Sequence, residues 1–192
     1  MKRFVLSLAL LALPGAASAA DIFCEYPWFV RNLIFDRAGY CFSSPLGQAL
    51  FDNSDCTGTE VTLSPRDTAA VAHIQDLEGW ELCEVDTSAQ RLEHQDAFQH
   101  LRQMTVLPIP VEHESGCIGY QGPDLPLLPA PGPLSSPVLG MLTQNADLHF
   151  GHLPEGGWEF VGVYPEGWSG GPAAYGWVDF GGQQPICSQY AG

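Results

Sequence analysis

The sequence predicts an α+β protein, in which a small helical, disulfide-bonded N-terminal module precedes a small β-barrel. Three observations lead to this prediction. All six cysteines of the 192-residue chain follow an apolar leader. Helix-capping patterns concentrate before about residue 107, and short apolar runs separated by glycine and proline follow it. We therefore divide the chain into a signal peptide at 1–19, a first module at 20–106, a linker at 107–116 and a second module at 117–192.

The leader has the charged start, apolar centre and small-residue end of a secretory signal peptide. Lys2 and Arg3 begin it, Phe4 to Leu13 are uncharged and mostly apolar, and Ala17-Ser18-Ala19 fits the A-x-A cleavage rule. The apolar run is too short to span a bilayer, which needs about 20 residues. We expect cleavage after Ala19 and a periplasmic or secreted protein without membrane insertion.

The net charge of the chain limits the classes of molecule that it can bind. The formal net charge is −15, and removal of Lys2 and Arg3 with the leader takes it to −17 and leaves no lysine. Such a chain repels phosphate backbones, so nucleic acid and anionic lipid are poor partners. A cationic protein or a neutral polymer remains compatible with this charge.

The even cysteine count indicates three disulfides in an oxidising compartment. Cys117 and Cys187 lie at the two ends of the second module, and we expect them to pair because the ends of a small barrel commonly meet. An antiparallel hairpin of the first two helices would pair Cys24–Cys56 and Cys41–Cys83. The alternative pairing, Cys41–Cys56 with Cys24–Cys83, stays open, since the chain between Cys41 and Cys56 is short.

Three helix starts are visible in the first module. Pro27 suits the first turn of a helix that ends near Gly39, which favours a left-handed C-cap. Ser44-Pro45 and Ser64-Pro65 each combine an N-cap serine with proline at the first helical position. Residues 92–104 are weakly helical in pattern.

The first of these helices carries a family motif. The segment Arg31 to Phe42 resembles the YARHG domain, an extracellular bacterial module with the approximate signature R-N-x-I-Y-A-R-H-G-Y-x-F. The resemblance implies an extracellular protein and a structural motif, but no biochemical activity. The matching residues are Arg31, Asn32, Ile34, Arg37, Gly39, Tyr40 and Phe42.

The second module shows short strands separated by turn residues, which is typical of small barrels. Strands are expected at 125–132, 138–142, 147–150, 158–163 and 175–180. Gly157-Trp158, Val161 and Gly176-Trp177-Val178 resemble the bacterial SH3-like fold, over about 117–192. That resemblance implies a small SH3-like β-barrel, whose groove in this family often binds cell-wall peptides or other proteins.

Aromatic side chains are the candidate binding residues of this module, because rigid rings give large contact area at low entropic cost. We single out Trp168, Tyr175 and Trp158, and expect Trp168 to be exposed because it lies in a glycine-rich loop. No G-x-S-x-G, H-E-x-x-H or P-loop motif occurs in the chain. We therefore predict no catalytic residues, no metal and no cofactor.

Two functions are compatible with these observations. The first is a non-enzymatic, exported binding or scaffolding protein of the cell envelope, whose barrel recognises cell-wall peptide or a protein partner. The alternative is an acidic periplasmic inhibitor of a cationic hydrolase such as lysozyme, suggested by export, three disulfides and the negative charge.

Overall fold

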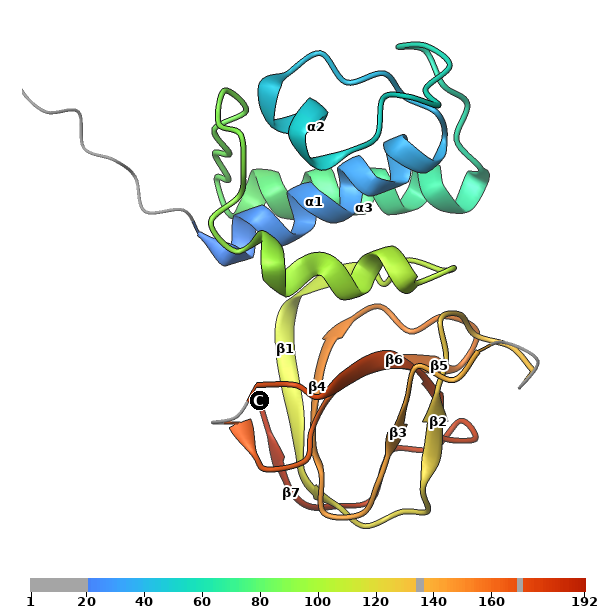
Figure 1. The fold of residues 1–192 in the computed structure, drawn as a ribbon. Coiled ribbons are helices and arrows are strands. Elements are labelled where there is room, and N and C mark those ends of the chain that lie inside the picture. Colours follow the sequence, from blue (N-terminus) through green and yellow to red (C-terminus); the bar gives the residue numbers. More distant parts are fainter. Residues whose placement is uncertain (1–20, 134–136, 169–170) are drawn as a thin grey trace, which may run out of the picture.

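The computed structural model describes residues 21–133, 137–168 and 171–192. Helices form one layer and an antiparallel sheet forms the other (Figure 1). The predicted signal peptide and its cleavage after Ala19 lie outside the described residues. Within these residues, no helix is both long and apolar enough to cross a membrane.

Helix α1 (Ile22–Arg37) begins earlier than the sequence predicted. Asp21 is its N-cap, and the Asp21 carboxylate accepts a hydrogen bond from the Phe23 amide. Pro27 therefore lies inside the helix rather than in its first turn. At the other end Gly39, with φ +85°, takes the left-handed conformation expected after a helix.

The other two α-helices begin where the serine–proline pairs predicted. Helix α2 spans Pro45–Leu50, and its N-cap Ser44 accepts a hydrogen bond from the Gly47 amide. Helix α3 spans Pro65–Trp80, and Ser64 accepts one from the Asp67 amide. The weakly helical stretch forms a 3-10 helix, η1 (Gln95–Gln103), which lies between the α-helices and the sheet (Figure 1).

The main sheet has five antiparallel strands in the order β6-β5-β4-β1-β7. Its edge strands β6 and β7 do not pair, so the sheet is open, and the expected closed barrel was wrong. The strands are β1 (Pro110–Tyr120), β4 (Asp147–His152), β5 (Trp158–Tyr164), β6 (Ala174–Asp179) and β7 (Cys187–Ala191).

A separate two-stranded sheet lies beside the edge strand β6. Strands β2 (Leu125–Leu127) and β3 (Gly140–Leu142) pair with each other. Among the residues that the structure describes, one bridge joins them to the main sheet, in which the backbones of Leu128 and Trp177 exchange two hydrogen bonds of 2.9 and 2.8 Å. One bridge does not continue the ladder, which explains why the strands fail to close.

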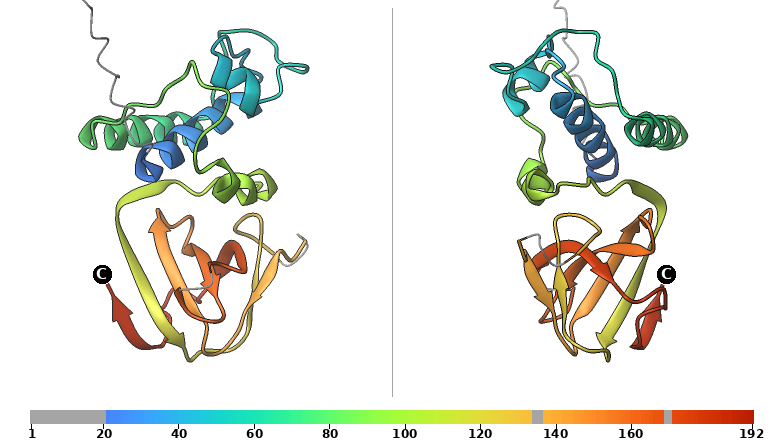
Figure 2. Two further views of the ribbon diagram at one scale, coloured as in Figure 1. Left: turned by 60° about the vertical axis from the view of Figure 1, so that its left-hand side comes forward. Right: turned by 90° about the vertical axis from the view of Figure 1, so that its right-hand side faces the viewer.

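Strand β1 occupies most of the segment that composition marked as a linker. Residues 107–116 include the buried Leu107 and Ile109, followed by the start of the longest strand. Figure 2 shows β1 running from the helical layer down the whole sheet. This segment is therefore part of the packed structure.

One hydrophobic core extends across both halves of the chain. It contains the buried faces of α1, α3 and η1 together with Phe160 and Trp177 of the sheet. The Trp177 indole donates a hydrogen bond of 2.9 Å to the Val106 carbonyl. A second core fills the other face of the sheet around Leu148, Val161 and Val163.

Three disulfides link Cys24–Cys83, Cys41–Cys56 and Cys117–Cys187. The bridge between Cys117 and Cys187 joins β1 to β7 and is the pair that the sequence analysis expected. The other two are the alternative pairing that the sequence left open, and the preferred Cys24–Cys56 and Cys41–Cys83 were wrong. Helix α2 is too short for the assumed hairpin, and the chain after it folds back so that the Cys41 amide donates to the Gly58 carbonyl at 2.8 Å. Cys41 thereby meets Cys56, while the start of α1 lies beside the end of α3.

Candidate functional site

The polar residues of the YARHG motif bind the first module together. The Arg31 guanidinium lies 3.1 and 3.0 Å from the two carboxylate oxygens of Glu78 on α3. The Arg37 guanidinium donates a hydrogen bond of 2.7 Å to the carbonyl of Met104, the residue that follows η1. The Asn32 side-chain amide donates a hydrogen bond of 2.7 Å to the Trp28 carbonyl within α1. These contacts are structural, because each one satisfies a partner inside the fold.

Gly39 and Tyr40 of the same motif form the contact with the returning chain. A Cβ atom at Gly39 would lie 2.8 Å from the Thr57 hydroxyl. The Tyr40 ring packs edge-on against Phe35 and Phe42, with centroids 5.8 and 5.1 Å away. Both positions therefore shape the Cys41–Cys56 loop.

The three aromatic residues singled out from the sequence do not form one site. Trp158 is half-buried and packs on the core that the helices share with the sheet. Tyr175 stacks on His100 of η1 with centroids 3.7 Å apart, and burial raises the pKa of Tyr175 to about 12. Trp168 is 42% exposed and contacts the Tyr164 ring, 4.7 Å between centroids.

Buried imidazole and phenol groups connect the two halves of the chain. The Tyr26 hydroxyl and His152 Nε2 share a hydrogen bond of 2.7 Å. Burial lowers the pKa of His152 to about 3 and that of His100 to about 4. Among the described residues, His152 Nδ1 and His100 Nε2 have no hydrogen-bond partner. Both histidines are therefore neutral parts of the junction at physiological pH.

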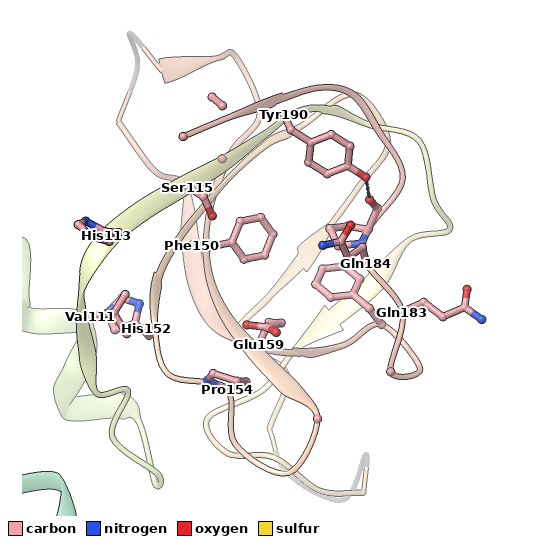
Figure 3. A pocket seen from close by; sticks show the side chains of 17 residues that line it. Val111, His113, Ser115, Phe150, His152, Pro154, Glu159, Gln183, Gln184 and Tyr190 are labelled. Carbon is pink, nitrogen blue, oxygen red and sulfur yellow. Dashed lines mark hydrogen bonds between the residues drawn. The ribbon is translucent and has the colours of Figure 1, made fainter. Parts of the chain in front are cut away.

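The sheet forms an open groove of about 760 Å³ on the side shown in Figure 3. Strand β1 supplies His113 and Ser115, and the connection between β6 and β7 supplies Gln183 and Gln184. The Phe150 ring lies in the middle of the groove, with Tyr190 above it and Glu159 below (Figure 3).

The groove combines aromatic and polar side chains with one acidic side chain. Phe150 and Phe180 lie 6.4 Å apart between ring centroids and form an aromatic surface. Glu159 carries the one side-chain carboxylate among the described lining residues, and none of these residues forms a hydrogen bond or ion pair with it. Burial raises the pKa of Glu159, because its charge loses hydration there. A cationic ligand group would compensate for that loss.

Backbone groups of β1 are available beside the groove. Pro110 pairs with His152 and Ser115 pairs with Phe150, with an irregularity in the register between them. Strand β7 pairs with β1 only from Gly116 onward, and Gly192, which follows β7, lies against the Glu114 carbonyl. In the described strand register, residues 111–114 consequently have no paired residue. Unpaired strand backbone is a template on which another extended chain can add.

The sequence analysis missed these groove residues. Phe150 fell within a predicted strand, but Glu159, Gln183 and Tyr190 belong to segments far apart in sequence, so no local motif marked them. The one available indication was Glu159 itself, an acidic residue inside the apolar run Trp158 to Val163. In the part of the chain that the structure describes, no three His, Cys, Asp or Glu side chains gather as they would around a metal ion.

The fold and groove define a disulfide-bonded protein with a helical half and an open antiparallel sheet. The family model described as domain of unknown function (DUF4453) matches residues 82–192, more than half of the chain. The chain therefore belongs to the DUF4453 family. The YARHG domain model matches residues 2–79, which confirms that resemblance, and neither match supports the SH3-like one. The YARHG domain is extracellular, and the disulfides are consistent with an exported protein.

The two family matches meet near residue 80, whereas the composition shift lies near residue 107. No curated protein and no solved structure matches the chain.

Proposed function

We propose that this protein is an exported, periplasmic or secreted, non-enzymatic binding protein of the cell envelope. Its ligand is an extended peptide of the cell wall or of a protein partner, which binds in the groove of Figure 3.

The observation that carries this proposal is the unpaired backbone of residues 111–114 beside an aromatic groove. Peptides that add to a free strand gain affinity from main-chain hydrogen bonds and specificity from alternate side chains. A peptide laid along β1 would place every second side chain over Phe150 and toward Glu159.

The charge in the groove favours a ligand with a free ammonium group. The Glu159 carboxylate is half-buried and free of protein partners among the described residues. A charge-assisted hydrogen bond to an ammonium would offset its lost hydration. Wall peptides that contain a diamino acid have this chemistry.

A distant likeness of the sheet to bacterial SH3-like domains belongs to the same proposal, in an opened form. Its support is the Gly176-Trp177-Val178 sequence in β6, where Trp177 and Val178 are fully buried.

Isothermal titration calorimetry with a synthetic wall stem peptide tests the proposal. The peptide with a free side-chain ammonium should bind, and the same peptide with that ammonium acetylated should bind about tenfold more weakly. The Glu159→Gln variant should bind the unacetylated peptide about tenfold more weakly than the unmodified chain does. Each tenfold loss corresponds to ~1.4 kcal/mol of binding free energy. Glu60→Gln is the matched control, since Glu60 is exposed and outside the groove. If neither peptide binds, the proposal is overturned for cell-wall ligands.

A further inference from the structure

Large apolar side chains are exposed where α1 begins and α3 ends. Phe23 is 63% exposed, Trp80 74% and Leu82 84%. The disulfide between Cys24 and Cys83 brings these two ends together, with a Cα–Cα distance of 5.2 Å. Phe23 and Leu82 each precede a bridged cysteine, so they belong to one region of the surface. Gathered apolar exposure of this kind marks interaction sites.

A cavity of about 520 Å³ opens in this region between α1, the end of α3 and β1. We call it the α1–α3 cavity. Its rim carries four carboxylates, and none of its described lining residues is lysine, arginine or histidine. The apolar lining consists of Ile22, Phe23, Pro27, Leu77, Pro110 and Val111, and the carboxylates are those of Asp21, Glu81, Glu112 and Glu114.

The rim carboxylates remain without a permanent cationic partner among the described residues. Glu114 lies 3.1 Å from His149 Nε2, and Glu112 lies 3.8 Å from the exposed His113. Asp21 accepts a hydrogen bond from the Phe23 amide. No arginine forms an ion pair with any of the four in the part of the chain described. The rim is therefore negative and complementary to a basic surface.

Leu82 takes the left-handed conformation that ends α3, where the Leu82 amide donates to the Gly79 carbonyl and the Cys83 amide donates to the Glu78 carbonyl. Its φ is +52°, in the left-handed region that costs a branched apolar residue about 1–2 kcal/mol. Its side chain gains nothing in return from burial, because it is 84% exposed. Asparagine or glycine would suit this backbone better. The exposed leucine therefore adds to the apolar surface around the bridge between Cys24 and Cys83.

We propose that the α1–α3 cavity docks a basic, amphipathic segment of a partner protein. An apolar side chain of that segment enters the cavity beside Phe23 and Leu77, and flanking lysine or arginine side chains pair with the rim carboxylates. Apart from Val111, which lines both sites, this surface is distinct from the peptide groove, because alternate residues of β1 face the two sites. His113 and Ser115 line the groove, whereas Glu112 and Glu114 line the α1–α3 cavity.

Fluorescence anisotropy with a labelled peptide of alternating lysine and leucine tests this docking. The full chain should bind this peptide, and a peptide with glutamate in place of lysine should not bind. Phe23→Ala should weaken binding about tenfold without loss of stability, since Phe23 lines the cavity with a mostly exposed side chain and alanine suits a helix. Glu81→Gln with Glu112→Gln should also weaken it about tenfold, and rising salt should reduce the difference.

Matched controls separate the cavity from the general acidity of the chain. Ile186→Ala removes a similarly exposed apolar side chain elsewhere, and Glu60→Gln with Glu166→Gln removes two exposed charges outside the cavity. Both controls, and the groove variant Glu159→Gln, should bind as the unmodified chain does. Equal binding of the lysine and glutamate peptides, or equal losses in cavity and control variants, would overturn the proposal.

Discussion

The Tyr26 hydroxyl on α1 and His152 Nε2 on β4 form a 2.7 Å hydrogen bond between residues 126 positions apart. The two rings also meet edge-on, with centroids 5.6 Å apart. His152 in turn packs edge-on against Phe160 of β5, at 4.8 Å. The helical half and the sheet thus share a polar contact inside their common core.

Stability should fall as the pH is lowered from about 6.5 to 4. Burial lowers the pKa of His152 to about 3 and of His100 to about 4, from an ordinary value of 6.5. In that window the unfolded chain binds protons that the folded chain does not, so acid favours unfolding. Urea unfolding at a series of pH values should show a loss on the order of 1 kcal/mol or more per histidine.

The histidine variants test the origin of this loss. His152→Gln combined with His100→Gln should flatten the pH dependence, whatever its effect on stability at neutral pH. His113→Gln should keep the original slope, because that imidazole is 88% exposed. A slope unchanged in the double variant would contradict the assignment.

The two halves should unfold in a single transition, because one core spans them. Phe98 of η1 is 1% exposed and packs against Tyr26 and Phe29 of α1, in the core that also contains Phe160. Phe98→Ala should cost about 3–5 kcal/mol and lower the stability of the sheet as well as the helices. Far-ultraviolet circular dichroism and tryptophan fluorescence should give coincident curves. Two separate transitions would show that the halves are independent.

Two glycine substitutions should have opposite effects. Gly39→Ala places a Cβ 2.8 Å from the Thr57 hydroxyl at φ +85°, and should destabilise the protein by about 1–3 kcal/mol. Gly79→Ala lies in α3 with open space around it, and should stabilise it by about 0.5–1 kcal/mol. Thermal unfolding of both variants checks the pair. Similar melting temperatures would contradict the close approach at Gly39.

Strand addition in the groove predicts sensitivity to the ligand backbone. A peptide methylated on alternate amide nitrogens should bind in one phase of methylation and fail in the other, because only alternate residues of an added strand face β1. Calorimetry with the two peptides measures this. Equal affinities would exclude pairing with residues 111–114.

Local signals in the sequence were sufficient for much of the fold. Ser44 and Ser64 marked the starts of α2 and α3 because a helix cap depends on neighbouring residues only. The alternation in Trp158 to Val163 indicated β5, because its two faces pack against the two different cores. The YARHG motif was visible because its residues are consecutive.

The remaining features depend on contacts between distant residues. Strand β1 was missed because residues 112–115 are exposed on both sides, so no hydrophobic alternation appears. Strand β7 was missed for the same reason. The disulfide pairing depended on where α3 lies against α1, and the groove on a sheet order that no segment encodes alone. Exposed Trp168 does not itself line the groove, although its ring lies against Gly116, which does.

The bridge between Cys24 and Cys83 has a consequence for how this chain can be divided. Cys24 lies in the YARHG match at 2–79 and Cys83 in the DUF4453 match at 82–192. If the segment of either family match were expressed alone, it would therefore contain one cysteine without its disulfide partner. That thiol could form a disulfide with a second copy of the segment. A nick at the exposed residues Trp80 to Leu82 would leave the pieces covalently joined until a reductant is added. A disulfide bond thus joins the segments of the two families in addition to the continuous peptide chain.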